Sequence, residues 1–215
     1  MMFSRDIWHA HSAWYSFFGN SLLAPMSCDG AMGLEPRFWD EFPFAFHEKA
    51  MEGLRDIKAA TRRYENIEAC DVLQDVNLAY AKLFIGPPRP AAPPWETAYR
   101  SKVDKSVLFG QATFEMHDKL RKAGLAINNE RHQLADHIGL ELLYLAAESD
   151  KFSIGRSQLL DVREVRFFIE ERLLSWIGSF TEAVVKSDSS GYYAGMAKTI
   201  WGVLLWDIDQ LKACG

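Results

Sequence analysis

The ten residues Gly86-Pro-Pro-Arg-Pro-Ala-Ala-Pro-Pro-Trp95 interrupt a chain that otherwise has the periodicity of helices. Five of the eight prolines of the 215-residue sequence lie in this stretch. Proline fixes φ and has no backbone N–H to donate, so the stretch is neither a helix nor a central strand. We therefore expect a rigid crossover loop between helical parts of the chain.

The segments around the loop have the apolar spacing of helices. Between Val72 and Phe84, for example, apolar residues recur at every fourth position, which places them on one helical face. We find no period-2 strand pattern and no internal repeat of about 20–50 residues. The sequence predicts a single all-α domain over 1–215 with eight or nine helices and room for a smaller C-terminal helical subdomain. The predicted helices cover about 4–23, 36–39, 44–63, 67–84, 108–123, 136–147, 157–186 and 192–212.

A polar connector suggests how the domain is organised. We expect an N-terminal helical part over about 1–124, a C-terminal part over about 136–215 and a hinge at 124–135. Because a flexible segment between two helical halves permits exchange, the chain is expected to be a monomer or a domain-swapped dimer.

Composition excludes several classes of protein. Hydrophobic residues make up 48% of the chain, which indicates a globular protein and not a disordered one. The net charge of −5 disfavours nucleic-acid binding. No apolar run is long enough for a membrane span, and the N-terminus lacks the pattern of a signal peptide, so we expect a cytoplasmic protein. Three widely spaced cysteines are expected to be reduced thiols.

Adjacent Asp136 and His137 are the first candidates for chemistry. Neighbours on a helix point about 100° apart, which opposes an acid–base dyad. Asp136 instead has the residue type of an N-cap, accepting the N–H of Ile138 or Gly139. His137 then lies in the first turn, as a structural histidine or as part of a polar site at the helix start.

Other catalytic and ligand-binding motifs give no positive signal. His9 and His11 are two residues apart, which splits them across a helix, so we expect no metal site. Nucleotide-binding glycine motifs and the G-x-S-x-G nucleophile motif do not occur. We therefore expect no catalytic residues and no cofactor.

The proline loop is a candidate for peptide binding. Trp95, Tyr99 and Phe84 would line a groove that the prolines stiffen, and a stiff loop loses little entropy when a peptide binds. In one alternative, Trp95 only fills the core and the prolines only hold a crossover. In another, the prolines are a ligand for an SH3-like domain.

Four motifs follow one another along the chain: Leu83-Phe-Ile-Gly-Pro87, Pro93-Pro-Trp-Glu96 with Tyr99, Ser106-Val-Leu-Phe-Gly110 and Asp136-His-Ile-Gly139. In this order they resemble the TorD/DmsD family of bacterial molybdoenzyme maturation chaperones. The resemblance implies a cytoplasmic, non-enzymatic helical protein. It would bind the twin-arginine leader of an apo-reductase of the dimethyl sulfoxide or trimethylamine N-oxide type, and hold the precursor back from export until its molybdopterin cofactor is inserted.

The resemblance also implies a set of site residues. The matched positions are Trp95, Gly110, Asp136 and His137, with Phe84, Pro94, Tyr99 and Leu108 as supports. A leader offers two guanidinium groups and then an apolar stretch. Because arginine prefers carboxylates in fork geometry, we expect Asp136, helped by Glu96 or Glu141, to receive them.

The chain departs from the family pattern beside this site. The family has an acid four residues before the histidine, often followed by proline, whereas this chain has Gln133 and Leu134. Pro88 stands where some members have Trp. The role of the missing carboxylate would pass to Glu130 or Glu141. Two other functions remain open at this point: a hydrolase or nucleotide-dependent enzyme with His137 as base, and a helical adaptor without a peptide groove.

Overall fold

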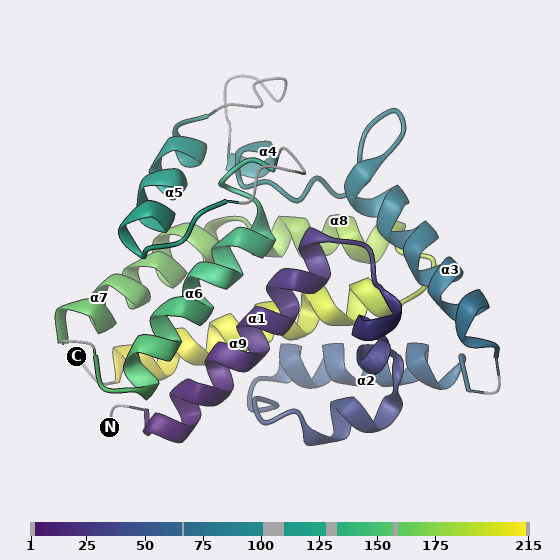
Figure 1. The fold of residues 1–215 in the computed structure, drawn as a ribbon, viewed down its shortest axis with the longest axis horizontal. Coiled ribbons are helices and arrows are strands. Elements are labelled where there is room, and N and C mark those ends of the chain that lie inside the picture. Colours follow the sequence, from purple (N-terminus) through teal and green to yellow (C-terminus); the bar gives the residue numbers. More distant parts are fainter. Residues whose placement is uncertain (1–2, 66, 101–109, 128–132, 157–158, 214–215) are drawn as a thin grey trace. The chain divides into compact units, whose positions relative to one another are not determined.

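The computed structural model describes residues 3–65, 67–100, 110–127, 133–156 and 159–213 (Figure 1). The prediction of an all-α fold is confirmed, and the described residues contain nine α-helices. These are α1 (Arg5–Leu23), α2 (Glu48–Arg62), α3 (Ala69–Tyr80), α4 (Thr97–Arg100), α5 (Gln111–Lys122), α6 (Ile138–Ser153), α7 (Leu159–Phe167), α8 (Ile177–Ser187) and α9 (Tyr192–Lys212). The 3₁₀ segments are η1 (Cys28–Leu34), η2 (Pro36–Glu41) and η6 (Leu173–Ser175), and the π-helical turns are η3 (Ala81–Ile85) and η5 (Phe168–Arg172).

The single helix predicted over 157–186 is wrong. The chain passes from α7 through the turns η5 and η6 before α8 begins. Trp176 leaves the helical conformation with φ −139° and ψ −20°, and its side chain is buried. The apolar spacing on both sides is helical, so the periodicity alone does not reveal the break.

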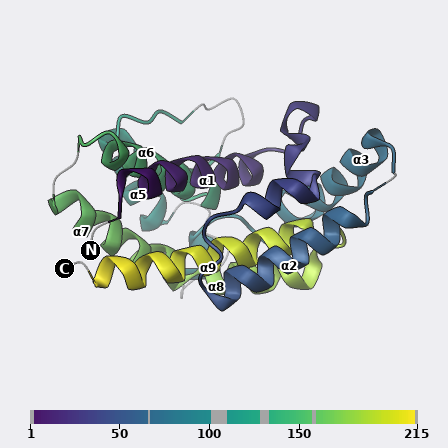
Figure 2. The ribbon, with the colours of Figure 1, turned by 90° about the horizontal axis from the view of Figure 1, so that it is seen from below.

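Chain segments far apart in sequence build one compact unit from Met1–Leu23, Pro94–Trp176 and Ile208–Gly215. In this unit α1 packs along α6 (Figures 1 and 2). The two backbones touch, because a Cβ on Gly19 would lie 2.8 Å from the carbonyl oxygen of Gly139. Farther along, the rings of Trp8 and Phe152 stack with centroids 4.5 Å apart. Two glycines therefore permit the close approach that buries the aromatic face of α1.

The second compact unit consists of Ala24–Pro93 and Ile177–Asp207. Here α2 crosses the first part of α9 at small residues, since a Cβ on Gly195 would lie 2.6 Å from the backbone nitrogen of Ile57. Phe84 belongs to this unit, where its ring lies 5.4 Å from Tyr193 and 6.1 Å from Phe180.

The proline stretch forms the expected loop, with a cis peptide bond between Pro87 and Pro88. Gly86 has φ +95°, a conformation that favours glycine, and turns the chain out of η3. The loop then folds back on that turn: the N–H of Ala92 donates to the carbonyl of Leu83 at 2.8 Å.

The predicted hinge at 124–135 and the division on either side of it stay predictions, and residues 128–132 lie outside the described residues. Among the helices that the structure describes, we find none with the length and apolar character of a membrane span.

Candidate functional site

The end of the proline loop is joined to the start of α6 by two antiparallel backbone hydrogen bonds. The N–H of Glu96 donates to the carbonyl of Asp136 at 3.0 Å, and the N–H of Ile138 donates to that of Pro94 at 2.8 Å. Trp95 and His137 are therefore paired across this bridge, with the indole edge-on to the imidazole and the ring centroids 6.1 Å apart. Two sequence motifs that are about forty residues apart thus meet at one place.

Asp136 fastens three helices together. Its side chain is fully buried and accepts hydrogen bonds from the backbone N–H of Thr97 at 3.0 Å, the hydroxyl of Thr97 at 2.5 Å and the hydroxyl of Thr113 at 2.9 Å. The prediction that Asp136 caps α6 is wrong. The Ile138 N–H is taken by Pro94 and the Gly139 N–H by His137, so neither donor is left for Asp136.

His137 is the N-cap of α6. Its Nδ1 accepts the N–H of Gly139 at 3.0 Å, so the ring proton of the neutral imidazole is on Nε2. Burial lowers the pKa of His137 to about 3, because charging a ring away from water is unfavourable. A buried histidine with such a pKa and an occupied Nδ1 is a weak base, which disfavours the His137-dependent enzyme.

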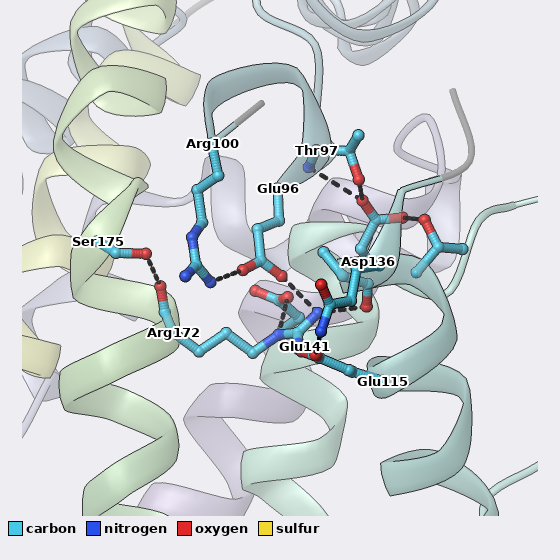
Figure 3. Close-up of polar contacts among 11 residues, drawn as sticks. Glu96, Thr97, Arg100, Glu115, Asp136, Glu141, Arg172 and Ser175 are labelled. Atoms are coloured by element: carbon cyan, nitrogen blue, oxygen red, sulfur yellow. Dashed lines mark hydrogen bonds and ion pairs between the residues drawn. The ribbon is translucent and has the colours of Figure 1, made fainter. Parts of the chain in front are cut away.

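Arg172, the last residue of η5, lies at the centre of a carboxylate cluster (Figure 3). Its Nε donates to Glu141 at 2.9 Å, its Nη1 is 3.5 Å from Glu115, and its Nη2 pairs with Glu96. Nη2 also donates to the carbonyl of Ala112 at 2.7 Å. The side chains of Glu96 and Glu141 are fully buried, and that of Arg172 is 7% exposed. One guanidinium therefore joins α5, α6 and the residue that precedes α4 to η5.

The charges in this cluster are only partly balanced. Burial and the nearby Glu96 raise the pKa of Glu141 well above its usual value, and Arg172 acts in the opposite direction. A second arginine, Arg100, pairs with the other oxygen of Glu96 from a side chain that is 44% exposed. Glu115, by contrast, keeps 51% of its side chain exposed, so it is the carboxylate of the cluster that solvent reaches.

Sequence reasoning missed Arg172 altogether. It assigned the guanidinium groups of a leader to Asp136, helped by Glu96 or Glu141. In the structure the oxygens of Asp136 accept from Thr97 and Thr113, and both glutamates already hold an arginine of this chain. The available signal was Glu141 itself, because a carboxylate on the apolar face of a buried helix requires a partner. No residue spacing points to Arg172 as that partner, since it lies 31 positions away along the chain.

The other residues that the sequence predicted for the site differ in the solvent exposure of their side chains. Trp95, Tyr99 and Gly110 are partly exposed, whereas Pro94 is buried. The ring of Tyr99 stacks on Trp176 with centroids 5.5 Å apart. Phe84 lies in the second unit, and Leu108 lies outside the described residues, as do most of the motif 106–110 and Glu130. Trp95 and Tyr99 are thus the aromatic residues of this site with surface to offer.

Within the described part of the chain, no group of three or more histidine, cysteine or carboxylate side chains is arranged so that it could hold a metal ion.

Comparisons with known proteins identify the family. Residues 47–182 match the model of the family described as nitrate reductase delta subunit. Similar proteins include the probable Tat proofreading chaperone DmsD of Haemophilus influenzae, 30% identical over 137 residues, which are 63% of this chain and 62% of the relative, less than two thirds of its length. The chaperone protein TorD of Vibrio vulnificus is 26% identical over 67% of this chain and 68% of its own length. TorD of Shewanella oneidensis is 24% identical over 91% of this chain and 88% of its own length.

These names are those of chaperones, which supports the expectation of a protein that is not an enzyme. The matched region contains the paired Trp95 and His137 together with Glu96, Asp136 and Arg172, which we call the bridged site. Because it also covers more than half of the chain, the chain belongs to the nitrate reductase delta subunit family, that of the TorD/DmsD-type chaperones which its motifs resemble.

Proposed function

We propose that the chain is a cytoplasmic chaperone that binds the twin-arginine leader of a molybdopterin-dependent reductase of the dimethyl sulfoxide or trimethylamine N-oxide type. It holds the apo-reductase back from export while the cofactor is inserted. The observation that carries this proposal is the bridge between Trp95 and His137, which joins two of the four family motifs within the region that matches the family model. The name of the Haemophilus relative, a Tat proofreading chaperone, supports the choice of ligand.

Burial divides the predicted site into a framework and a contact surface. Asp136, His137, Glu96 and Glu141 are each 1% exposed or less, so they position the loop end and the helix start. The partly exposed Trp95 and Tyr99 offer apolar surface to a peptide. The guanidinium groups of the leader then require carboxylates other than the two that Arg172 occupies, and Glu115 is the half-exposed member of that cluster.

Calorimetric titration tests the proposal. The ligands are synthetic leaders of dimethyl sulfoxide and trimethylamine N-oxide reductases, each also made with its arginine pair replaced by glutamines. We expect the arginine leaders to bind and the glutamine leaders to bind more weakly, because charge-assisted bonds to carboxylates are lost. Absence of binding by every arginine leader to the wild-type protein would refute the proposal.

Trp95→Ala tests the contact surface. It should weaken binding by about tenfold or more, since buried aromatic anchors dominate such interfaces. Trp14→Ala, at a partly exposed tryptophan of α1, is the matched control and should bind as the wild type does. Gel filtration over a range of concentrations tests the expected monomer or domain-swapped dimer.

A further inference from the structure

A surface pocket of about 800 Å³ lies between α5 and the chain on either side of the connector. We call it the α5 pocket. One wall comes from α5 and the other from residues 125–127 and 133–135. Its volume is in the range of pockets that hold a ligand or several side chains of a peptide. The predictions from sequence did not include this pocket.

The lining of the α5 pocket is mainly apolar. Phe114 projects from α5 with 68% of its surface exposed, and Leu120, Leu125 and Leu134 are among the other apolar residues of the walls. The exposed ring of Phe114 beside this pocket is apolar surface that a bound partner would remove from water. Among the described residues that line the pocket there is no carboxylate, and one of the two ionisable residues there, Arg121, lies 3.6 Å from Asp118 in an ion pair.

The pocket lies next to Asp136 of the site. Thr113 lines it and also donates its hydroxyl to Asp136 at 2.9 Å. Ala135, another lining residue, directly precedes Asp136. Glu115 follows Phe114 on α5, points about 100° away from it and lies 3.5 Å from the Nη1 of Arg172. A peptide that contacts Glu115 would therefore pass over the exposed side chains of Asp118 and Phe114 to reach this pocket.

Carboxylates on α5 make the surroundings of the pocket suitable for arginine. Asp118, one turn after Phe114, has a side chain that is 64% exposed, and Glu115 is 51% exposed. Both are accessible to a guanidinium group, unlike Glu96 and Glu141. An apolar pocket with accessible carboxylates on the same helix matches a ligand that has arginines followed by an apolar stretch.

We propose that the α5 pocket binds the apolar stretch of the leader and that Glu115 and Asp118 receive its arginine pair. This inference rests on the proposed function and deepens it. Gln133 and Leu134, two of the three positions at which the chain departs from the pattern of the family, both line the pocket. The uncharged amide and the added leucine make this wall more apolar, so these residues select leaders by their apolar stretch.

The first test removes apolar surface from the pocket. Phe114→Ser should weaken binding of the arginine leaders by about tenfold or more, the effect of losing one buried phenylalanine contact. Because Phe114 is mostly exposed, the variant should keep the melting temperature of the wild type. The matched control is Phe167→Ser on α7, where the phenylalanine is 64% exposed and does not line the pocket. It should bind within about twofold of the wild type.

The second test changes ligand and protein together. In leaders whose leucines are replaced by serines, Phe114→Ser should have almost no further effect, because the partner of the ring is already gone. Ala126→Trp, at an exposed lining residue, should fill the pocket and weaken binding of the leucine leaders. Asp118→Asn should weaken binding of the arginine leaders and leave binding of the glutamine leaders unchanged.

The possible outcomes separate the two proposals. If the leaders bind the wild type and bind Phe114→Ser and Ala126→Trp equally well, the pocket assignment is overturned and the proposed function stands. If no leader binds the wild type, the proposed function fails and the pocket assignment fails with it. An equal loss for leucine and serine leaders in Phe114→Ser would also overturn the pocket, since the ring would then act on something other than the apolar stretch.

Discussion

Arg172→Met tests whether the buried guanidinium holds the site together. Methionine has a similar length and no charge, so the change leaves Glu96 and Glu141 fully buried without their main counter-charge. Arg100 can compensate only at Glu96, from a side chain that is 44% exposed. Removing one partner of a buried ion pair typically costs about 3–5 kcal/mol. We therefore expect Arg172→Met to lower the free energy of unfolding by an amount in that range.

The pH dependence of this loss identifies its cause. Burial already raises the pKa of the Glu141 carboxyl above that of glutamate in the unfolded chain, about 4.3, and Arg172 opposes this shift, so without Arg172 the pKa of Glu141 should rise further. The folded variant then binds more protons than the unfolded one, so its free energy of unfolding falls as pH rises. The deficit relative to the wild type should therefore be smaller near pH 5 than near pH 8.

Urea unfolding followed by far-ultraviolet circular dichroism measures both effects. Arg172→Met combined with Glu141→Gln should recover part of the loss, because the amide removes one buried charge. The control is Arg166→Met, whose arginine is 39% exposed and lies 3.9 Å from Glu170. Exposed pairs of that kind contribute at most about 1 kcal/mol. A similar small loss for Arg172→Met, or a deficit that does not change with pH, would refute the reasoning.

Three further predictions concern the framework around this cluster. His137→Asn keeps a capping acceptor but does not titrate. The wild-type ring stays neutral when folded and becomes charged in the unfolded chain near pH 6.5, so between pH 7 and pH 5 the wild type should lose about 2 kcal/mol of its free energy of unfolding through this group. The variant should not show this loss, which urea unfolding curves at the two pH values will measure. Gly19→Ala places a methyl group 2.8 Å from the Gly139 oxygen and should lower the free energy of unfolding by about 1–3 kcal/mol, and an unchanged urea midpoint would contradict the close contact of α1 and α6. Thr113→Val removes the hydroxyl that Asp136 accepts and should cost about 1–3 kcal/mol; thermal melts that match the wild type would show that the bond contributes little.

The sequence predicted the helical class and most helix boundaries because apolar spacing records which face of a helix is buried. It placed the proline loop correctly for an equally local reason, since proline excludes the alternatives without reference to any other part of the chain. The motifs also named residues that the structure brings together, with Trp95 paired to His137.

The predictions from sequence were wrong where a residue far away in the chain determines the hydrogen-bond partner. Asp136 has the right residue type for an N-cap, but Thr97 and Thr113, 39 and 23 positions away, take its oxygens. His137 became the cap although histidine is not a preferred residue there. The role of Arg172 was not predicted, because a sequence pattern does not show which buried carboxylates will pair with the same guanidinium. Local spacing cannot report such contacts, which depend on the packing of several helices.

The pairing of α1 with α6 has a consequence for synthesis on the ribosome. More than a hundred residues separate the end of α1 at Leu23 from the start of α6 at Ile138. At translation rates of about 5–20 residues per second, α1 is made several seconds before its partner. During that interval the side chains that later contact α6, among them Trp8, have no α6 to cover them. A member of a family of chaperones is thus, early in its own synthesis, a nascent chain with an uncovered aromatic helix.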